Sequence, residues 1–316
     1  LDYAKVRDSS EYKWEEFKKI VLYKIVNYVA VDSIYLTEEE VTKDPYGLFY
    51  APYQTIYKAI TPTNWLKPDA KYKLMIDFKN RPDVFATTDI VDANIQFQIP
   101  QANYPLNLAS FNASTGGVNY NDNVTVKWTP ATNVSKYDLT LRFNYLEEKY
   151  AEPEHINLIS RDTLSMDYSI GTYNSDNLEL LGGYLSTNFG GEGFFRMLEN
   201  RLTKDPNIKR VIGHENSIST HAKCFEVMLG MANEDLNTYI SVNSPVTGVI
   251  QERPTYSNVT NGLGLLASRS QVIQKDITLV GGGSQVGNLY AFSIGTYCLG
   301  LNFCDPDVTS AFSCGN

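Results

Sequence analysis

The sequence predicts a mainly β protein made of two β-sandwich domains. In residues 123–128 and 137–145 every second residue is apolar or aromatic. These residues are Val124, Val126, Trp128, Tyr137, Leu139, Leu141, Phe143 and Tyr145. A two-residue period is typical of a strand that buries one face, and such a sheet needs a second layer to cover that face. We therefore expect this strand pair to organise one of the two domains.

Composition agrees with this fold class. The 316 residues include 22 Tyr, 14 Phe and 13 Pro, and aromatic residues favour strands while prolines mark strand ends. The chain is 43% hydrophobic and 20% charged, which indicates a globular protein. The formal net charge of −9, without a dense Lys/Arg tract, argues against a nucleic-acid-binding surface.

We expect the first domain, residues 1–100, to be an immunoglobulin-like sandwich. The Val-, Ile- and Tyr-rich residues 17–36 predict strands, and residues 48–60 continue as an extended segment. Residues 72–78 and 84–88 predict a hairpin around the turn at 80–83. Pro100 and Pro105 indicate a linker at 99–106, because proline interrupts strand pairing.

The second domain, residues 101–316, is expected to be a fibronectin-III-like sandwich with an α/β insertion at 188–245. Within that insertion, the apolar stripe in residues 190–205 predicts a helix that Pro206 ends. Strands are expected at 209–213 and 223–231, and a short helix at 233–242. Residues 277–304 have no charge, but glycines and polar residues interrupt them, so we expect sheet segments with glycine corners instead of a transmembrane helix.

Several short segments, taken in order, carry a family resemblance. They are GLFYAP at 47–52, the strand at 72–78, ATT at 86–88 leading to Ile99-Pro100, WTP at 128–130, the strand at 137–145, GFF at 193–195 and NVTNGLGLLAS at 258–268. Together they resemble the uncharacterised immunoglobulin-like surface lipoproteins of Bacteroidota. The resemblance implies an exported outer-membrane protein tethered through a lipidated N-terminal cysteine, and it supplies no catalytic residues. That cysteine is not in this sequence, which opens at Leu1, so we expect a mature or truncated chain.

The four cysteines predict a disulfide more readily than a metal site. Cys224, Cys298, Cys304 and Cys314 form no CxxC pair and no His/Cys group with the spacing of a zinc site. If the protein is exported, either Cys298–Cys304 or Cys304–Cys314 could close a short loop. Cys224 lies in an apolar stretch and is expected to be a buried thiol.

No catalytic motif, cofactor or metal is predicted. The histidines, His155, His214 and His221, lack a partner nucleophile signature, although Ser and Thr residues lie nearby. Glutamates cluster at 38–40 and 147–154, and paired carboxylates are what a glycosidase would need. Solvent-exposed acidic loops are the simpler interpretation of both clusters.

Aromatic residues provide the candidate binding site. They are Tyr46, Tyr50, Tyr53, Tyr57 and Trp65. Such rings stack on sugars and anchor protein contacts, although filling a Tyr-rich core is the simpler role. Asn112, Asn123, Asn133 and Asn258 fit the N-x-S/T pattern. The family resemblance further suggests O-glycosylation at Ser33 and Thr163, each of which follows an Asp and precedes an apolar residue.

The predicted function is a non-enzymatic surface protein that binds another envelope protein or a glycan. Rigid sandwich domains, abundant Tyr and the lack of a catalytic motif favour it. The first alternative is a carbohydrate-active enzyme or accessory module that uses the acidic clusters. The second is a fibre or surface-layer subunit in which residues 277–303 pair between chains by strand addition.

Overall fold

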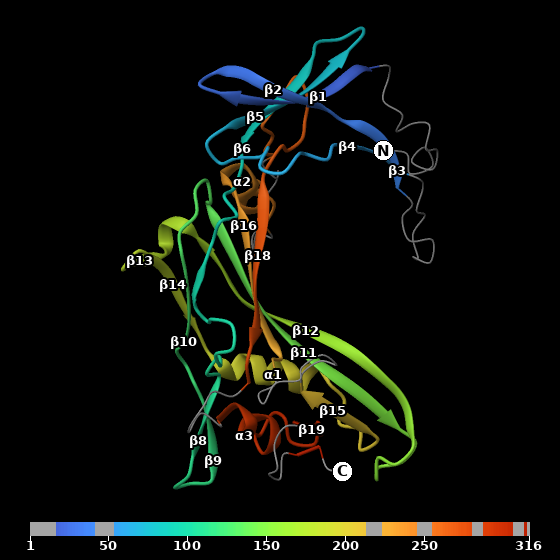
Figure 1. Cartoon of the computed structure of the whole chain (residues 1–316), viewed down its shortest axis with the longest axis vertical. Helices are drawn as coiled ribbons and strands as arrows, with labels where there is room; N and C mark the ends of the chain where they lie inside the picture. The colour runs from blue at the N-terminus through green and yellow to red at the C-terminus, as the bar shows by residue number, and fades with distance from the viewer. Residues whose placement is uncertain are drawn as a thin grey trace, which may run out of the picture. The chain divides into compact units, whose positions relative to one another are not determined.

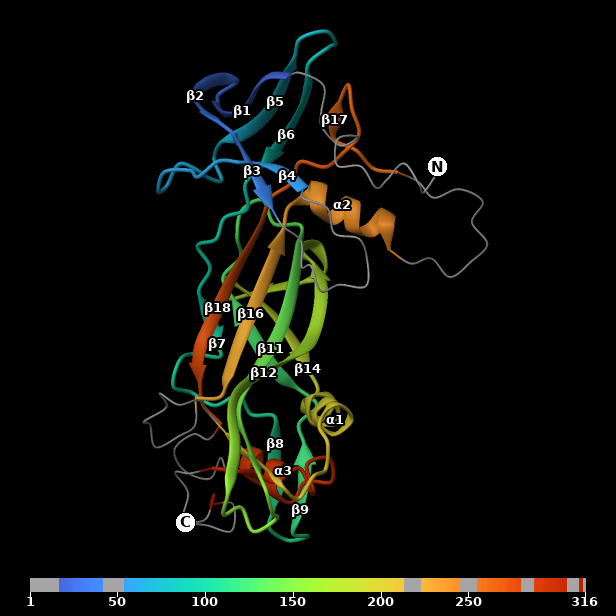
Figure 2. The ribbon, with the colours of Figure 1, turned by 90° about the vertical axis from the view of Figure 1, so that its right-hand side faces the viewer.

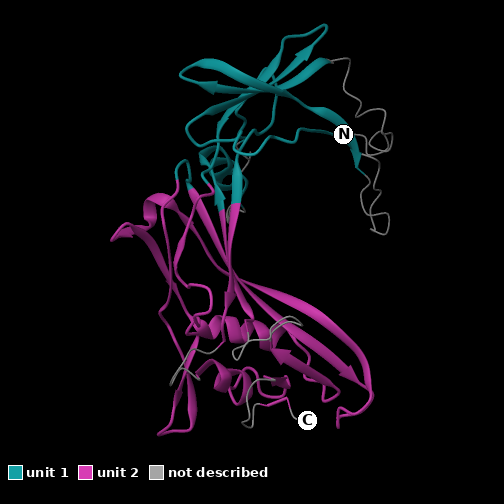
Figure 3. Ribbon diagram, viewed as in Figure 1, with its two compact units in different colours: residues 1–92, 132–135, 231–270 teal, residues 93–131, 136–230, 271–316 magenta. Residues whose placement is uncertain are grey.

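A computed structural model describes residues 17–41, 54–212, 223–244, 255–279, 287–305 and 313–314. These residues form several antiparallel sheets and three α-helices, so the mainly β prediction is confirmed. The chain divides into two compact units (Figure 3). Unit 1 comprises Leu1–Asp92, Thr132–Ser135 and Met231–Ser270, and unit 2 comprises Ala93–Ala131, Lys136–Gly230 and Gln271–Asn316. This division differs from two consecutive domains meeting near residue 100, because later segments return to unit 1.

Unit 1 contains an antiparallel sheet with the strand order β17-β6-β5-β1-β2 and a two-stranded ribbon, β3-β4 (Figure 1). Its elements are β1 (Phe17–Val26), β2 (Val29–Tyr35), β3 (Thr37–Val41), β4 (Gln54–Lys58), β5 (Lys71–Phe78), β6 (Val84–Asp89), α2 (Glu234–Asn243) and β17 (Val259–Thr260). The β5–β6 hairpin lies where the sequence predicted it, and Tyr72 pairs with Thr88. Asn233 accepts a hydrogen bond from the backbone N–H of Leu236 and thereby caps α2.

Unit 2 contains a sheet with the order β13-β14-β10-β7 and the hairpin β8-β9. A larger sheet has the order β18-β16-β11-β15-β19, and β12 also pairs with β11. The elements are β7 (Phe97–Ile99), β8 (Ala109–Asn112), β9 (Gly117–Tyr120), β10 (Val124–Trp128), β11 (Lys136–Tyr150), β12 (Leu158–Asn174), β13 (Glu179–Leu181), β14 (Tyr184–Phe189), α1 (Gly191–Arg201), β15 (Ile208–Ile212), α3 (Gly287–Ser293) and β19 (Phe303–Cys304). Two further strands, β16 (Phe225–Ala232) and β18 (Arg269–Ile277), contribute residues to both units and run alongside β11 (Figure 2).

The alternating residues of β10 and β11 form the core of unit 2, as predicted. Trp128 and Tyr137 are both buried, and their ring centroids lie 5.4 Å apart, so the two sheets face each other here. Phe143 is fully buried, and five aromatic rings surround it at centroid distances of 5.2 to 5.8 Å. These rings belong to Tyr145, Phe194, Phe225, Phe292 and Phe303. The cluster therefore joins β11 to α1, β16, α3 and β19.

The segment at 277–304 differs from the predicted run of sheet segments. Its described part contains α3, whose Leu289, Ala291 and Phe292 are buried. Asn288 holds this helix to β8, because its Oδ1 accepts the N–H groups of Leu108 and Ala109 at 3.0 Å. The side chain of Asn288 also donates to the carbonyls of Leu106 and Leu279. The described part of this segment, residues 277–279 and 287–304, therefore includes a helix and buried side chains, and not only the strands that the sequence predicted.

Candidate protein-binding surface

The β1–β2 hairpin of unit 1 ends in a two-residue turn, Asn27-Tyr28, between the paired residues Val26 and Val29. Both turn residues have positive φ, 49° for Asn27 and 66° for Tyr28. Positive φ at both central positions defines a type I′ turn, whose twist matches the twist of the flanking strands. Asparagine tolerates this conformation, but a bulky side chain such as tyrosine is an outlier there. The turn therefore holds Tyr28 in an unfavourable backbone conformation.

Burial does not compensate for this cost. Tyr28 has a relative exposure of 101%, so its ring is in solvent. Val29 and Val31 follow it and are 61% and 56% exposed. We call Tyr28, Val29 and Val31 the hairpin knob. Tyr35, at the far end of β2, is also largely exposed. Strained residues without an evident packing role occur often at functional sites, which makes the knob a candidate contact surface.

The base of the hairpin is anchored to the core of unit 1. Trp65 is only 7% exposed and packs with Tyr72, at a ring centroid distance of 5.3 Å. Ile34 of β2 packs against this cluster. The indole Nε1–H of Trp65 donates to Asp32 Oδ2 at 2.7 Å, and Lys24 donates to the Trp65 carbonyl. The bond from Trp65, and a second one from the Ser33 N–H, hold the pKa of Asp32 below its usual value.

The backbone of β2 is poorly arranged to receive another strand. Val31 is the extra residue of a β-bulge, since Ala30 pairs with Ile25 while Asp32 already pairs with Lys24. The Leu36 N–H donates to the Ile20 carbonyl, so these two residues form a hydrogen-bonded pair. Such pairs alternate with non-bonded ones along an antiparallel ladder, so Ser33, three residues before Leu36, is in a non-bonded pair with Tyr23 and its N–H points away from β1. Asp32 Oδ1 accepts that N–H at 2.7 Å. A bulge and an occupied edge donor both hinder strand addition, so side chains are the more available feature of this surface.

The aromatic residues predicted as a binding platform do not form one among the described residues. Trp65 belongs to the core, and Tyr57 is half-buried in β4. Tyr46, Tyr50 and Tyr53 lie outside the described residues. The sequence predicted strands in residues 17–36 without locating the turn between them, so Tyr28 was not singled out. The polar Asn27 inside that apolar run was the one available sign of a turn.

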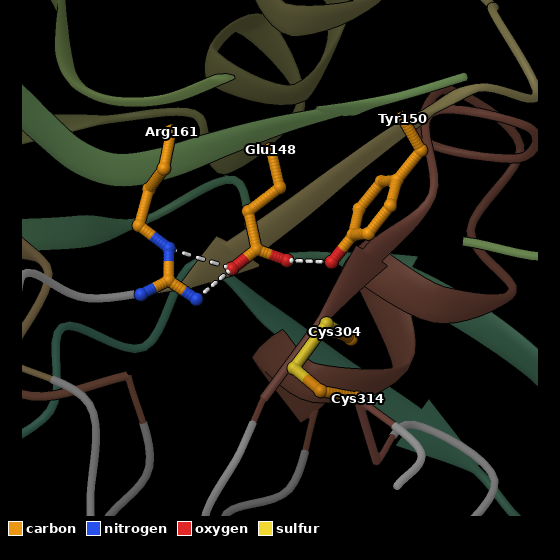
Figure 4. Close-up of a disulfide and its surroundings, with 5 residues drawn as sticks. All are labelled: Glu148, Tyr150, Arg161, Cys304 and Cys314. Carbon is orange, nitrogen blue, oxygen red and sulfur yellow. Dashed lines mark hydrogen bonds and ion pairs between the residues drawn. A yellow bond between two sulfur atoms is a disulfide. The ribbon is translucent and has the colours of Figure 1, made fainter. Parts of the chain in front are cut away.

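Glu147 and Glu148 lie within β11 and are bound to partners within unit 2. Glu147 pairs with the buried Arg210 at 2.9 Å. Glu148 is 3% exposed, accepts the Tyr150 hydroxyl at 2.6 Å and pairs with Arg161 (Figure 4). Burial alone would raise the pKa of Glu148, but these hydrogen bonds outweigh it and hold the pKa below its usual value.

The loop that follows β11 contains Glu152 and His155. Glu152 accepts backbone N–H groups of Asn157 and Ile156, which lower its pKa. A glycosidase acid needs a raised pKa, so neither Glu148 nor Glu152 is tuned for that role. Nε2 of His155 lies 2.9 Å from the Pro206 carbonyl oxygen. His214 and His221 lie outside the described residues.

Cys304 and Cys314 form a disulfide, which is one of the two pairings that the sequence left open (Figure 4). Cys298 and Cys224 are free and buried. Burial raises the pKa of both thiols, so neither is tuned for reaction. The suggested glycosylation positions, Ser33 in β2 and Thr163 in β12, are both exposed. The described residues contain no group of three or more His, Cys, Asp or Glu side chains that could hold a metal ion.

Comparison of the chain with protein-family models, curated proteins and solved structures found no match in any of the three. None of the helices in the described ranges is long and apolar enough to cross a membrane.

Proposed function

We propose that this protein is a non-enzymatic, exported binding protein that contacts another cell-envelope protein through the hairpin knob. The observation that supports this most is Tyr28, which combines full exposure with a left-handed backbone. Tyrosine supplies a large, rigid contact area and is enriched among the residues that dominate interface energies. In the isolated chain the Tyr28 side chain is exposed and its backbone is strained, so a partner would supply the contacts that the ring lacks.

The knob favours a particular kind of partner. The three exposed side chains of the knob, close together near one hairpin tip, fit a folded protein that offers an apolar pocket for the Tyr28 ring and an acceptor for its hydroxyl. A donated strand fits less well, because the β2 edge has a bulge and the Ser33 N–H is already bonded. The net charge of −9 would favour encounters with a basic surface.

The Cys304–Cys314 disulfide supports the exported location, since disulfides persist in oxidising compartments. We further propose that the protein belongs with the immunoglobulin-like surface lipoproteins that its sequence resembles, and that it lies at the outer face of an outer membrane. The several antiparallel sheets are compatible with immunoglobulin-like and fibronectin-III-like domains.

Site-specific crosslinking in the native envelope tests the proposal. A photoreactive residue would replace Ala30, which is exposed beside the knob, and in a control it would replace Ile60, which is exposed elsewhere in unit 1. We expect adducts from position 30 to map to one surface region of another envelope protein. The variant Tyr28→Asn should abolish them, whereas the matched control Ile60→Asn should retain them.

Three results would contradict the proposal. Adducts that survive Tyr28→Asn would show that the tyrosine ring is not the anchor. Adducts only from position 60 would place the contact elsewhere. Adducts to a second copy of this chain would show that the knob mediates self-association instead of binding a different envelope protein.

A further inference from the structure

Unit 2 contains a groove of about 630 Å³, within the range of 300–1,000 Å³ typical of small-ligand sites. It lies among the end of β7, residues 105–107 and residues 120–125. Its apolar lining includes Leu106 and Val124, which are buried, and Ile99 and Pro105, which are partly exposed. No residue of the β1–β2 hairpin contributes to this groove, so it is separate from the hairpin knob.

The backbone that forms the groove is held firmly. Asn288 bonds to the Leu106 carbonyl and to the N–H of Leu108, on either side of Asn107. The side chain of Asn121 donates to the Asn107 carbonyl at 2.7 Å, and its backbone N–H donates to Leu108. The Asn121 carbonyl accepts the N–H of Gly191 at the start of α1. The groove is therefore formed before any ligand binds, which lowers the entropic cost of binding.

Three polar side chains on the groove are free to contact a ligand. Asn107, Asp122 and Asn123 are exposed, and their side chains form no hydrogen bond within the described part of the chain. Each amide offers one acceptor and two donors, and the carboxylate can accept two hydrogen bonds side by side.

The charge of the groove selects among ligand classes. Among the described residues that line it, none is Lys or Arg, and Asp122 is the one with a charged side chain. An anionic ligand would meet this carboxylate without a compensating cation, which is unfavourable. A ligand with many hydroxyl groups, in contrast, satisfies amide and carboxylate groups while its C–H faces cover the apolar lining. We infer that the groove binds a neutral oligosaccharide.

Titration calorimetry on the full chain tests this inference. The probes are neutral fragments of glucan, mannan and xylan, with polygalacturonate as the anionic comparator. We expect at least one neutral fragment to bind, and Asp122→Ala or Asn107→Ala to weaken its affinity by about tenfold or more. Asp176→Ala, an exposed aspartate of the same unit that is not among the groove residues, is the matched control and should leave the affinity unchanged.

The inference would be overturned if none of the neutral fragments binds at millimolar concentration, or if polygalacturonate binds better than they do. Binding that survives both groove variants would equally overturn it, because the ligand would then occupy another surface. Unfolding curves for each variant should superimpose on the wild-type curve, since the substituted side chains are exposed and form no hydrogen bonds in the described structure.

Discussion

Replacing Tyr28 with glycine should stabilise the β1–β2 hairpin while removing the side chain that we propose as the anchor. A left-handed backbone costs a residue other than Gly, Asn or Asp about 1–2 kcal/mol. Glycine also has more conformational freedom in the unfolded chain than tyrosine. That freedom stabilises the unfolded state and offsets about 0.4–1 kcal/mol of the relieved strain. Because the Tyr28 ring is fully exposed, its removal loses no burial. The net effect should be a gain of about 0.5–1 kcal/mol in the free energy of unfolding.

Hydrogen exchange of the backbone amides in β1 and β2 provides the assay, because it reports the local opening free energy of this hairpin. Protection should rise by about two- to fivefold in Tyr28→Gly, since 1.4 kcal/mol corresponds to a factor of ten. Tyr28→Asn should also be stabilising, because asparagine tolerates the left-handed region. Tyr28→Phe keeps the strain and the ring, so its protection should equal that of the wild type.

A fall in protection on Tyr28→Gly would refute the strain argument, because it would show that the tyrosine side chain stabilises the turn. If glycine raised the protection and the crosslinked partner were still captured, the strain would be real but unrelated to binding. A gain in stability together with loss of the partner is the outcome that the structure predicts.

Three further perturbations test the rest of the structure. Asn288→Ala should destabilise unit 2 by about 3–5 kcal/mol in urea unfolding, because it leaves buried backbone groups of β8 and its neighbours without their partner; an unchanged midpoint would contradict this role. The pKa of Glu148 is lower in the folded protein than its ordinary value of 4.5. Ionised Glu148 therefore stabilises the fold fully above about pH 4.5, and this stabilisation is lost as pH falls through the folded pKa. Glu148→Gln should therefore flatten the loss of stability below about pH 4.5, and an unaltered acid profile would argue against the network. The Cys304–Cys314 disulfide links residues 10 apart in sequence, and reducing it should lower the free energy of unfolding by about 2–3 kcal/mol, measured as a shift in the unfolding midpoint. Thiol titration of the unreduced protein should detect two thiols, and only after unfolding, because Cys224 and Cys298 are buried.

Local periodicity predicted many of the individual elements. The alternation in residues 124–128 and 137–145 identified the buried faces of β10 and β11, because a strand places successive side chains on opposite sides. The apolar stripe and Pro206 located α1, which ends at Arg201. The same approach failed for α3, since an uncharged, glycine-interrupted segment has no period that separates a buried helix from buried strands. The helix is held by Asn288, whose partners at 106–109 lie about 180 residues away.

The candidate sites were less predictable. Tyr46, Tyr50, Tyr53, Tyr57 and Trp65 were grouped because they are close in sequence, yet Trp65 packs into the core through Tyr72 and Asp32. Exposure and backbone conformation, which single out Tyr28, depend on where the turn falls and on what covers it. Neither quantity is encoded in residue type alone.

By itself, the sequence determined the mainly β class, the inward faces of the central strands and the positions of two helices, because these follow from interactions between residues close together along the chain. Tertiary structure alone decided how Met231–Ser270 returns to unit 1, which side chains cover which rings, and which polar groups stay free along the groove. These features depend on contacts between distant segments, and their formation is governed by packing and by the pairing of buried polar groups, for which a local pattern has no signature.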